Sequence, residues 1–259
     1  MRRALPGFVG LVCLVLMLPI AIVVVLAFSG GTFLHFPPTS FSLRWFAVFF
    51  GDPRWQASLW SSLEIASVAC VLATVAGFLA AYAFVRRGFA GKKLLLSMLL
   101  LPTIAQTELT SIAMYFLSAR LGLVGNLVWV GCCHAVIALP VVLLILLSAL
   151  QGVDPVLERA ALSLGASRSR TMLRVVVPIA APGIVSAGRF AFLASFDELV
   201  ISLFLTNVAT QTLPVRIWNS LHLEIEPTIA AVSTFLIGVT ALILLLDTAV
   251  RGLRRTARS

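Results

Sequence analysis

The chain has 259 residues, of which 60% are hydrophobic and only 11% are charged, and its mean hydropathy is +1.07. This balance excludes a soluble globular protein and predicts an all-α, polytopic membrane protein. The formal net charge of +9 would suggest nucleic-acid binding in a soluble protein. In a membrane protein, excess Lys and Arg are instead expected in the cytoplasmic loops, so nucleic acid is not expected as a partner.

Six apolar runs are long enough to cross a bilayer as helices. The first follows Met1-Arg2-Arg3 and exceeds the hydrophobic core of a signal peptide, so we interpret it as an uncleaved span, although Ala27-Phe28-Ser29 loosely resembles a cleavage site. No internal repeat or separate soluble domain is evident, which predicts one transmembrane domain over residues 1–259. The expected spans cover residues of about 8–28, 58–85, 94–118, 127–150, 183–206 and 228–249.

Six spans place both termini on one side of the membrane, and the positive charges indicate which side. Fourteen of the 19 Lys and Arg residues lie in the N-terminus, the turn 86–93, the interval 151–182 and the tail 251–259, whereas four lie in the opposite loops. Because cytoplasmic loops are enriched in Lys and Arg, we expect both termini and the interval 151–182 in the cytoplasm.

The polar interval between the fourth and fifth spans carries helix start and stop signals. Asp154 can cap a helix N-terminus, and Gly165 can end that helix because glycine enters the left-handed conformation without a Cβ penalty. Ser167 can cap a second helix, which we expect to end at Pro178 and Pro182. The interval therefore predicts a pair of short helices.

A motif in this interval resembles a known family. Ala160-Ala161-x-x-x-Gly165-Ala166, followed by Val177-Pro178 and Pro182-Gly183, is similar to the EAA loop of permease subunits in ATP-binding-cassette (ABC) importers. The resemblance implies a cytoplasmic pair of coupling helices that docks into a groove on the ATPase subunit. The glutamate of the family motif falls on Arg159 here, and the nearest acid is Glu158. The expected ATPase-coupling residues are Leu157, Glu158, Arg159, Ala160, Ala161, Leu164, Gly165 and Ala166. The alternative, a soluble helix-turn-helix whose arginines contact DNA phosphates, conflicts with the membrane-length apolar runs on both sides.

Three acidic residues, Glu108, Asp197 and Glu198, lie inside predicted spans at similar depth, slightly toward the outer side. A charge near the bilayer centre costs roughly 2.5–3.5 kcal/mol on insertion scales, so such residues usually face a cavity or a partner. A cavity ringed by them would favour a cation, and Phe196 could add a cation–π contact. The alternative is structural pairing with another span or subunit. Arg189 lies eight residues before Asp197, too far along one helix to pair with it easily.

The stretch around these acids carries a second resemblance. Ser195-Phe196-Asp197-Glu198-Leu199-Val200-Ile201-Ser202, followed by Thr212-Leu213-Pro214, resembles the corresponding region of spermidine/putrescine permeases. This implies an importer of a small cationic solute, a polyamine such as spermidine or putrescine, although the subfamily also imports other amines and amino acids. The implied partners are two cytoplasmic ATP-binding subunits, a second homologous or identical permease subunit, a periplasmic or lipid-anchored substrate-binding protein, and membrane lipid. The implied location is the bacterial inner membrane.

No catalytic constellation is visible, so the chain is not expected to be an enzyme. Gly91-Lys92 lacks the glycine five residues earlier and the following Ser or Thr of a phosphate-binding loop. We therefore expect no cofactor on this chain, with ATP and Mg on the ATPase subunit. His134 stands alone in the fourth span, which favours a packed or interhelically bonded histidine over a metal ligand.

The competing class is an ion-coupled secondary transporter that uses the buried acids as proton or sodium sites. Broken helices and paired repeats would favour it. Pro102 and Pro140 could break spans, but no repeat is evident.

Overall fold

The computed structural model describes residues 4–31, 35–223 and 227–241. These residues form helices joined by turns, with one isolated bridge between Ser29 and Phe41, which confirms the all-α expectation for this part of the chain. The chain divides into two compact units, residues 1–56 with 216–259 and residues 57–215. Each unit is described by itself.

Several helices are long and apolar enough to cross a membrane. Within the described residues, four qualify by themselves: α1 (Ala4–Ala27), α3 (Pro53–Arg86), α6 (Leu127–Gln151) and the helical stretch Arg168–Phe196. The bent pair α4 (Lys92–Ile104) and α5 (Thr107–Leu121) would make a fifth span. The predicted sixth span appears as the shorter apolar helix Thr228–Ala241, and residues 242–249 lie outside the described residues. The count of six spans therefore stays a prediction.

The predicted third span, 94–118, is not one straight helix. Its two pieces, α4 and α5, are bent by 97° about Ala105 and Gln106, whose backbones are extended. Pro102 weakens the last turn of α4 because it lacks an N–H group. Glu108 in the first turn of α5 favours a new helix N-terminus there, where a negative charge meets the positive end of the helix dipole.

The predicted fifth span, 183–206, starts earlier than expected and is interrupted before its end. Pro178 and Pro182 do not end a helix: α8 (Arg168–Thr171) continues through the π-helical turn η1 (Met172–Val176) into α9 (Val177–Phe196). Pro178 lacks an N–H group and lies directly after the π-helical turn, and packing of the helix outweighs the cost of Pro178 and of Pro182 inside it. The span then breaks after Phe196 and resumes as α10 (Val200–Leu205).

The predicted outer loops also contain helices, α2 (Arg44–Gly51) and α11 (Leu213–Leu223). Trp45 and Trp55 are buried inside the first unit. The indole N–H of Trp45 donates to the carbonyl of Gly31 over 3.2 Å, and the Arg216 guanidinium lies 4.9 Å from the centre of the Trp55 ring. Both tryptophans therefore serve this unit's own packing.

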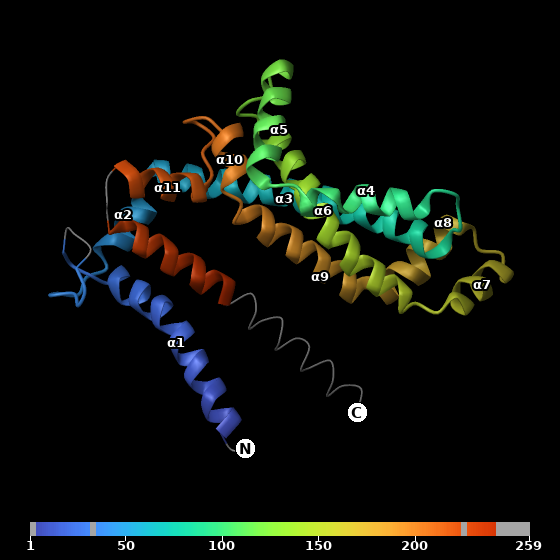
Figure 1. Cartoon of the computed structure of the whole chain (residues 1–259), viewed down its shortest axis with the longest axis horizontal. Coiled ribbons are helices and arrows are strands. Elements are labelled where there is room, and N and C mark those ends of the chain that lie inside the picture. The colour runs from blue at the N-terminus through green and yellow to red at the C-terminus, as the bar shows by residue number, and fades with distance from the viewer. Residues whose placement is uncertain (1–3, 32–34, 224–226, 242–259) are drawn as a thin grey trace. The chain divides into compact units, whose positions relative to one another are not determined.

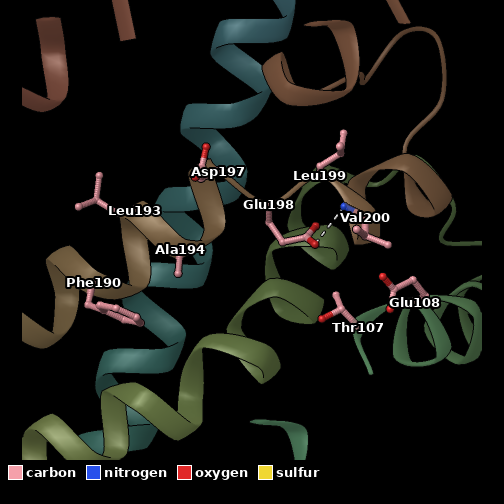
Figure 2. Close-up of a pocket in the computed structure, with 9 residues that line it drawn as sticks. All are labelled: Thr107, Glu108, Phe190, Leu193, Ala194, Asp197, Glu198, Leu199 and Val200. Carbon is pink, nitrogen blue, oxygen red and sulfur yellow. Dashed lines mark hydrogen bonds between the residues drawn. The ribbon is translucent and has the colours of Figure 1, made fainter. Parts of the chain in front are cut away.

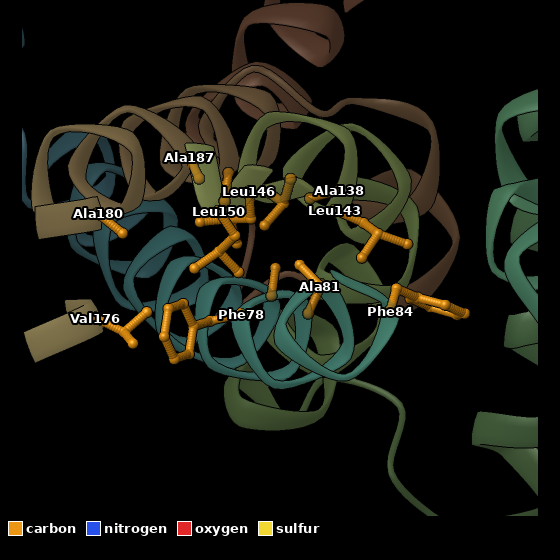
Figure 3. Close-up of a cluster of buried hydrophobic side chains, with 14 of the residues drawn as sticks. Phe78, Ala81, Phe84, Ala138, Leu143, Leu146, Leu150, Val176, Ala180 and Ala187 are labelled. Atoms are coloured by element: carbon orange, nitrogen blue, oxygen red, sulfur yellow. The ribbon is translucent and has the colours of Figure 1, made fainter. Parts of the chain in front are cut away.

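The core of the second unit lies between α3, α6 and α9, where side chains from all three helices interdigitate (Figure 3). Small residues let the helices approach closely: a Cβ added at Gly131 of α6 would lie 2.7 Å from the Val68 side chain of α3. Outside this core, α4 packs against α6, and α5 packs against α10. Figure 1 shows α5 and α10 at one end of α6 and α9, with α7 (Pro155–Ser163) and α8 at the other. The main contributors to the core are Phe78, Ala81 and Phe84 of α3, Leu143, Leu146 and Leu150 of α6, and Ala180 and Ala187 of α9.

Candidate functional site

A cavity of about 620 Å³ lies in the second unit where the two broken helices meet (Figure 2). Its lining includes Glu108 of α5 and Asp197 and Glu198 of the α9–α10 break. None of the nine lining residues is basic. The remaining lining residues are Thr107, Phe190, Leu193, Ala194, Leu199 and Val200.

The carboxylate of Glu198 is held by the start of α10. It accepts hydrogen bonds from the backbone N–H groups of Val200 (3.0 Å), Ile201 (2.9 Å) and Ser202 (3.3 Å). These amides have no intrahelical partner, and the negative charge lies at the positive end of the helix dipole. This capping interaction explains why the chain breaks after α9 and starts a new helix at this point.

Asp197 and Glu108 are placed differently from Glu198. Both residues are exposed, and in Figure 2 the Asp197 side chain points away from that of Glu198. Within residues 4–31, 35–223 and 227–241, neither carboxylate takes part in a side-chain hydrogen bond or ion pair. The two neighbouring acids of the sequence therefore have separate environments, one engaged by backbone amides and one open to a ligand.

His134 connects the two sides of the α9–α10 break. From α6, its Nδ1 lies 2.8 Å from the Ser195 hydroxyl in the last turn of α9, and its Nε2 lies 3.2 Å from the Ser202 hydroxyl in α10. Its Nε2 is also 3.6 Å from the Glu198 carboxylate. All three hydrogen-bonded residues are buried. The expectation of an interhelically bonded histidine is confirmed. Its serine partners were not predicted, although they flank the two acids in the sequence.

Phe196 is not brought to the cavity. Its ring stacks on that of Phe192, with centroids 5.8 Å apart and an interplanar angle of 14°. The aromatic residue that lines the cavity is instead Phe190, six positions earlier on α9. Sequence alone could not make this distinction, because it depends on how α9 is rotated against α6.

The helix that the sequence predicts to begin at Asp154 and end at Gly165 is observed as α7. The Asp154 carboxylate accepts the Val156 N–H over 2.8 Å at the N-terminus of α7. At the other end Gly165 has φ of +85°, and the N–H of Ala166 bonds to the carbonyl of Ala161 over 3.1 Å. This is a Schellman ending, in which a left-handed glycine lets the following amide reach back to the last turn.

The residues predicted to couple to the ATPase differ in their exposure to solvent. Leu157, Arg159, Ala160 and Leu164 are exposed, and 88% of Leu164 is accessible. Glu158 is instead buried against the end of α3, where its Oε1 lies 2.6 Å from Nε of Arg86. The exposed group forms an apolar surface with one positive charge. Ala161 and Ala166 are half-buried, and Gly165 is exposed in the turn.

Comparison with known proteins identifies the family. The model of the binding-protein-dependent transport system inner membrane component matches residues 73–258. The chain belongs to this family. It is therefore a transport component of the inner membrane. The members of this family are permease subunits of ABC importers and not enzymes.

Named relatives and a solved structure agree with this assignment. The chain is 28% identical to the spermidine/putrescine transport system permease protein PotC of Haemophilus influenzae over 242 residues, 93% of each chain. It is 27% identical to the putrescine transport system permease protein PotI of Escherichia coli strain K12, covering 78% of this chain and 74% of that one. The sulfoquinovosyl glycerol transport system permease protein SmoH of Agrobacterium fabrum is 31% identical over 65% of this chain and 59% of its own.

The fold is similar to that of a bacterial ABC transporter involved in the import of the acidic polysaccharide alginate. That crystal structure superposes with a TM-score of 0.77 over 95% of each chain, at 13% sequence identity. At this identity the likeness concerns the fold alone.

Proposed function

We propose that this chain forms half of the translocation path of an ABC importer for a small cationic solute, a polyamine such as spermidine or putrescine. The observation that carries the proposal is the cavity, which has three acids and no basic residue in its lining. The relatives named for spermidine and putrescine transport support the same substrate class.

The cavity suits a flexible cation in both charge and size. Its volume lies within the range of about 300–1,000 Å³ that is typical of small-molecule sites. Asp197 and Glu108 approach from different helices, so each can meet a separate ammonium group of one substrate. At an effective dielectric constant of about 20, one such contact at 4 Å is worth roughly 4 kcal/mol before desolvation is subtracted. Phe190 and Leu193 offer apolar contacts for the methylene groups between the charges.

The surface of α7 and the distribution of charge support the partners that we propose. Two cytoplasmic ATP-binding subunits, which carry ATP and Mg, would dock on the exposed residues of the coupling helix, beginning with Leu157 and Leu164. A second homologous or identical permease subunit would complete the path, and a substrate-binding protein would deliver the solute from outside. The Lys and Arg distribution supports cytoplasmic termini, and exposed apolar side chains along α1 suit contact with lipid.

Uptake by the reconstituted complex tests the substrate assignment. In proteoliposomes with the ATPase and binding protein, Asp197→Asn and Glu108→Gln should each raise the KM for spermidine by about tenfold, which corresponds to roughly 1.4 kcal/mol of lost attraction. Glu64→Gln is the matched control, because Glu64 is an exposed acid on α3 outside the cavity. An unchanged KM in the Asp197 and Glu108 double variant would remove these acids from the substrate path.

The same preparation tests the two competing functions. Broken helices beside buried acids are also found in ion-coupled transporters. Uptake that continued without the ATPase subunit and collapsed with the proton gradient would favour that mechanism. The relative named for sulfoquinovosyl glycerol transport supports an anionic solute, a sulfonated glycoside, as the alternative substrate class. Competition by such a solute, without competition by spermidine, would replace the polyamine assignment.

A further inference from the structure

The buried acid of α7 has its partners on α3 rather than on the molecular surface. Glu158 Oε1 lies 2.6 Å from Nε of Arg86, and Glu158 Oε2 accepts the Tyr82 hydroxyl over 3.1 Å. Arg86 Nη2 donates in addition to the carbonyl of Val153, just before α7, over 2.7 Å. The Arg86 and Glu158 side chains are only 14% and 12% exposed. Both carboxylate oxygens are therefore occupied within the chain.

We propose that Glu158 is a positioning residue that fastens the coupling helix to α3, and that it does not contact the ATPase subunit. This inference rests on the proposed docking of α7 to that subunit. Arg159, the next residue, is exposed. Successive residues on an α-helix point about 100° apart, so these two neighbours serve different surfaces.

The contact matters because α3 is remote in sequence from the coupling helix. Along the chain, α7 joins α6 through residues 152–154, and it packs against α8 and η1, which follow it directly. The Glu158–Arg86 pair adds a link to a helix 72 residues earlier. The same end of α3 supplies Phe78, Ala81 and Phe84 to the core. A displacement of α7 would thus be transmitted to α3 as well as to α6 and α9.

Because the Glu158–Arg86 ion pair is largely buried, the contact between α7 and α3 should be sensitive to substitution of either residue. Removing one partner of a buried ion pair leaves the other charge without compensation, so single changes are far more disruptive than the loss of an exposed pair. Reversing both charges together restores the attraction. The reciprocal exchange is therefore the most direct test of a transmission role.

The experiment uses the full complex of permease, ATPase and binding protein in proteoliposomes. A photoreactive amino acid at the exposed position 157 reports docking, and solute taken up per ATP hydrolysed reports transmission. Glu158→Arg and Arg86→Glu should each lower uptake per ATP by about tenfold while the crosslink to the ATPase is retained. The double variant should recover to within about threefold of the unmodified complex. Arg87→Glu is the matched control, since Arg87 is the exposed neighbour of Arg86.

Glu158→Gln keeps the inference testable if the charge reversals do not assemble. It preserves the size of the side chain and its hydrogen-bonding oxygen, and it should lower uptake per ATP by about threefold, whereas Arg87→Gln, at the exposed neighbour of Arg86, should leave the efficiency of the complex unchanged. Unchanged efficiency in Glu158→Gln, or a double variant no better than its single parents, would overturn the inference. Loss of the crosslink in Glu158→Gln would assign this residue to docking instead. If the complex that carries only the photoreactive residue at position 157, with Glu158 and Arg86 intact, did not crosslink to the ATPase, this result would contradict the proposed function itself.

Discussion

His134 should set the geometry of the α9–α10 break, and its replacement offers a graded test. The imidazole joins the Ser195 hydroxyl on one side of the break to the Ser202 hydroxyl on the other. Leucine at this position fills similar space but makes neither hydrogen bond. Asparagine places its amide near the former Nδ1 and can keep the Ser195 contact, whereas glutamine reaches toward the Ser202 contact.

The magnitude follows from the number of bonds and from their burial. Interhelical hydrogen bonds in membrane proteins contribute about 0.6 kcal/mol on average and up to about 1.7 kcal/mol. Ser195 and Ser202 are 4% and 0% exposed, so water cannot replace the ring, although each hydroxyl can turn back to a carbonyl of its own helix. His134→Leu should therefore cost about 1–3 kcal/mol, and the asparagine and glutamine variants about half as much. For a chain of this size, the apparent melting temperature should fall by roughly 2–10 °C.

The assay is thermal unfolding in mild detergent, followed by uptake kinetics in proteoliposomes. Because the break positions Asp197 beside the cavity, we also expect His134→Leu to raise the KM for spermidine more than it lowers ATP hydrolysis. Cys132→Ala on the same helix is the control, since that side chain is only half-buried and no hydrogen bond of its side chain occurs in the described residues. A melting temperature in His134→Leu equal to that of the control would refute the bridging role.

Two glycine positions provide further tests. Gly165→Ala and Gly165→Leu should each cost about 1–2 kcal/mol through backbone strain at φ of +85°, and because no neighbour lies within 4 Å of the added Cβ, the two should melt alike. Both should reduce coupled uptake by reorienting α7, and normal uptake in a well-expressed leucine variant would count against docking at this helix. Gly131→Ala should destabilise the second unit by about 1–3 kcal/mol, because the new Cβ would lie 2.7 Å from Val68 and 3.1 Å from the carbonyl of Ile65. Gly10→Ala, with open space around it, should not lower the melting temperature.

Local signals in the sequence were sufficient to predict features that depend only on neighbouring residues. Asp154 capping α7 and Gly165 ending it depend on atoms within a few residues, so both were predictable. The sequence also drew attention to Glu108, Asp197 and Glu198, because a charged residue inside an apolar span usually faces a cavity or a partner, and all three are among the residues that line the cavity.

Pro102 indicated that the third span could break, whereas the break in the fifth span was not foreseen, because apolar composition is the same on both sides of it. Helix-breaking residues were a poor guide there: Pro182 lies inside α9, whereas the break after Phe196 has no proline at all. Glu198 decides that break by capping α10 beside His134, which comes from a helix about 60 residues earlier in the chain.

Amino-acid composition, span lengths and the signals around Asp154 and Gly165 determined that this is a helical membrane protein with a short capped helix, α7, because hydrophobicity and helix capping act over a few residues at a time. The tertiary structure decided what each acid does. Glu158 and Arg159 are neighbours, as are Asp197 and Glu198, and within each pair one side chain is held inside while the other is exposed. That choice depends on the rotation of a helix against partners from distant parts of the chain, and no local pattern encodes it.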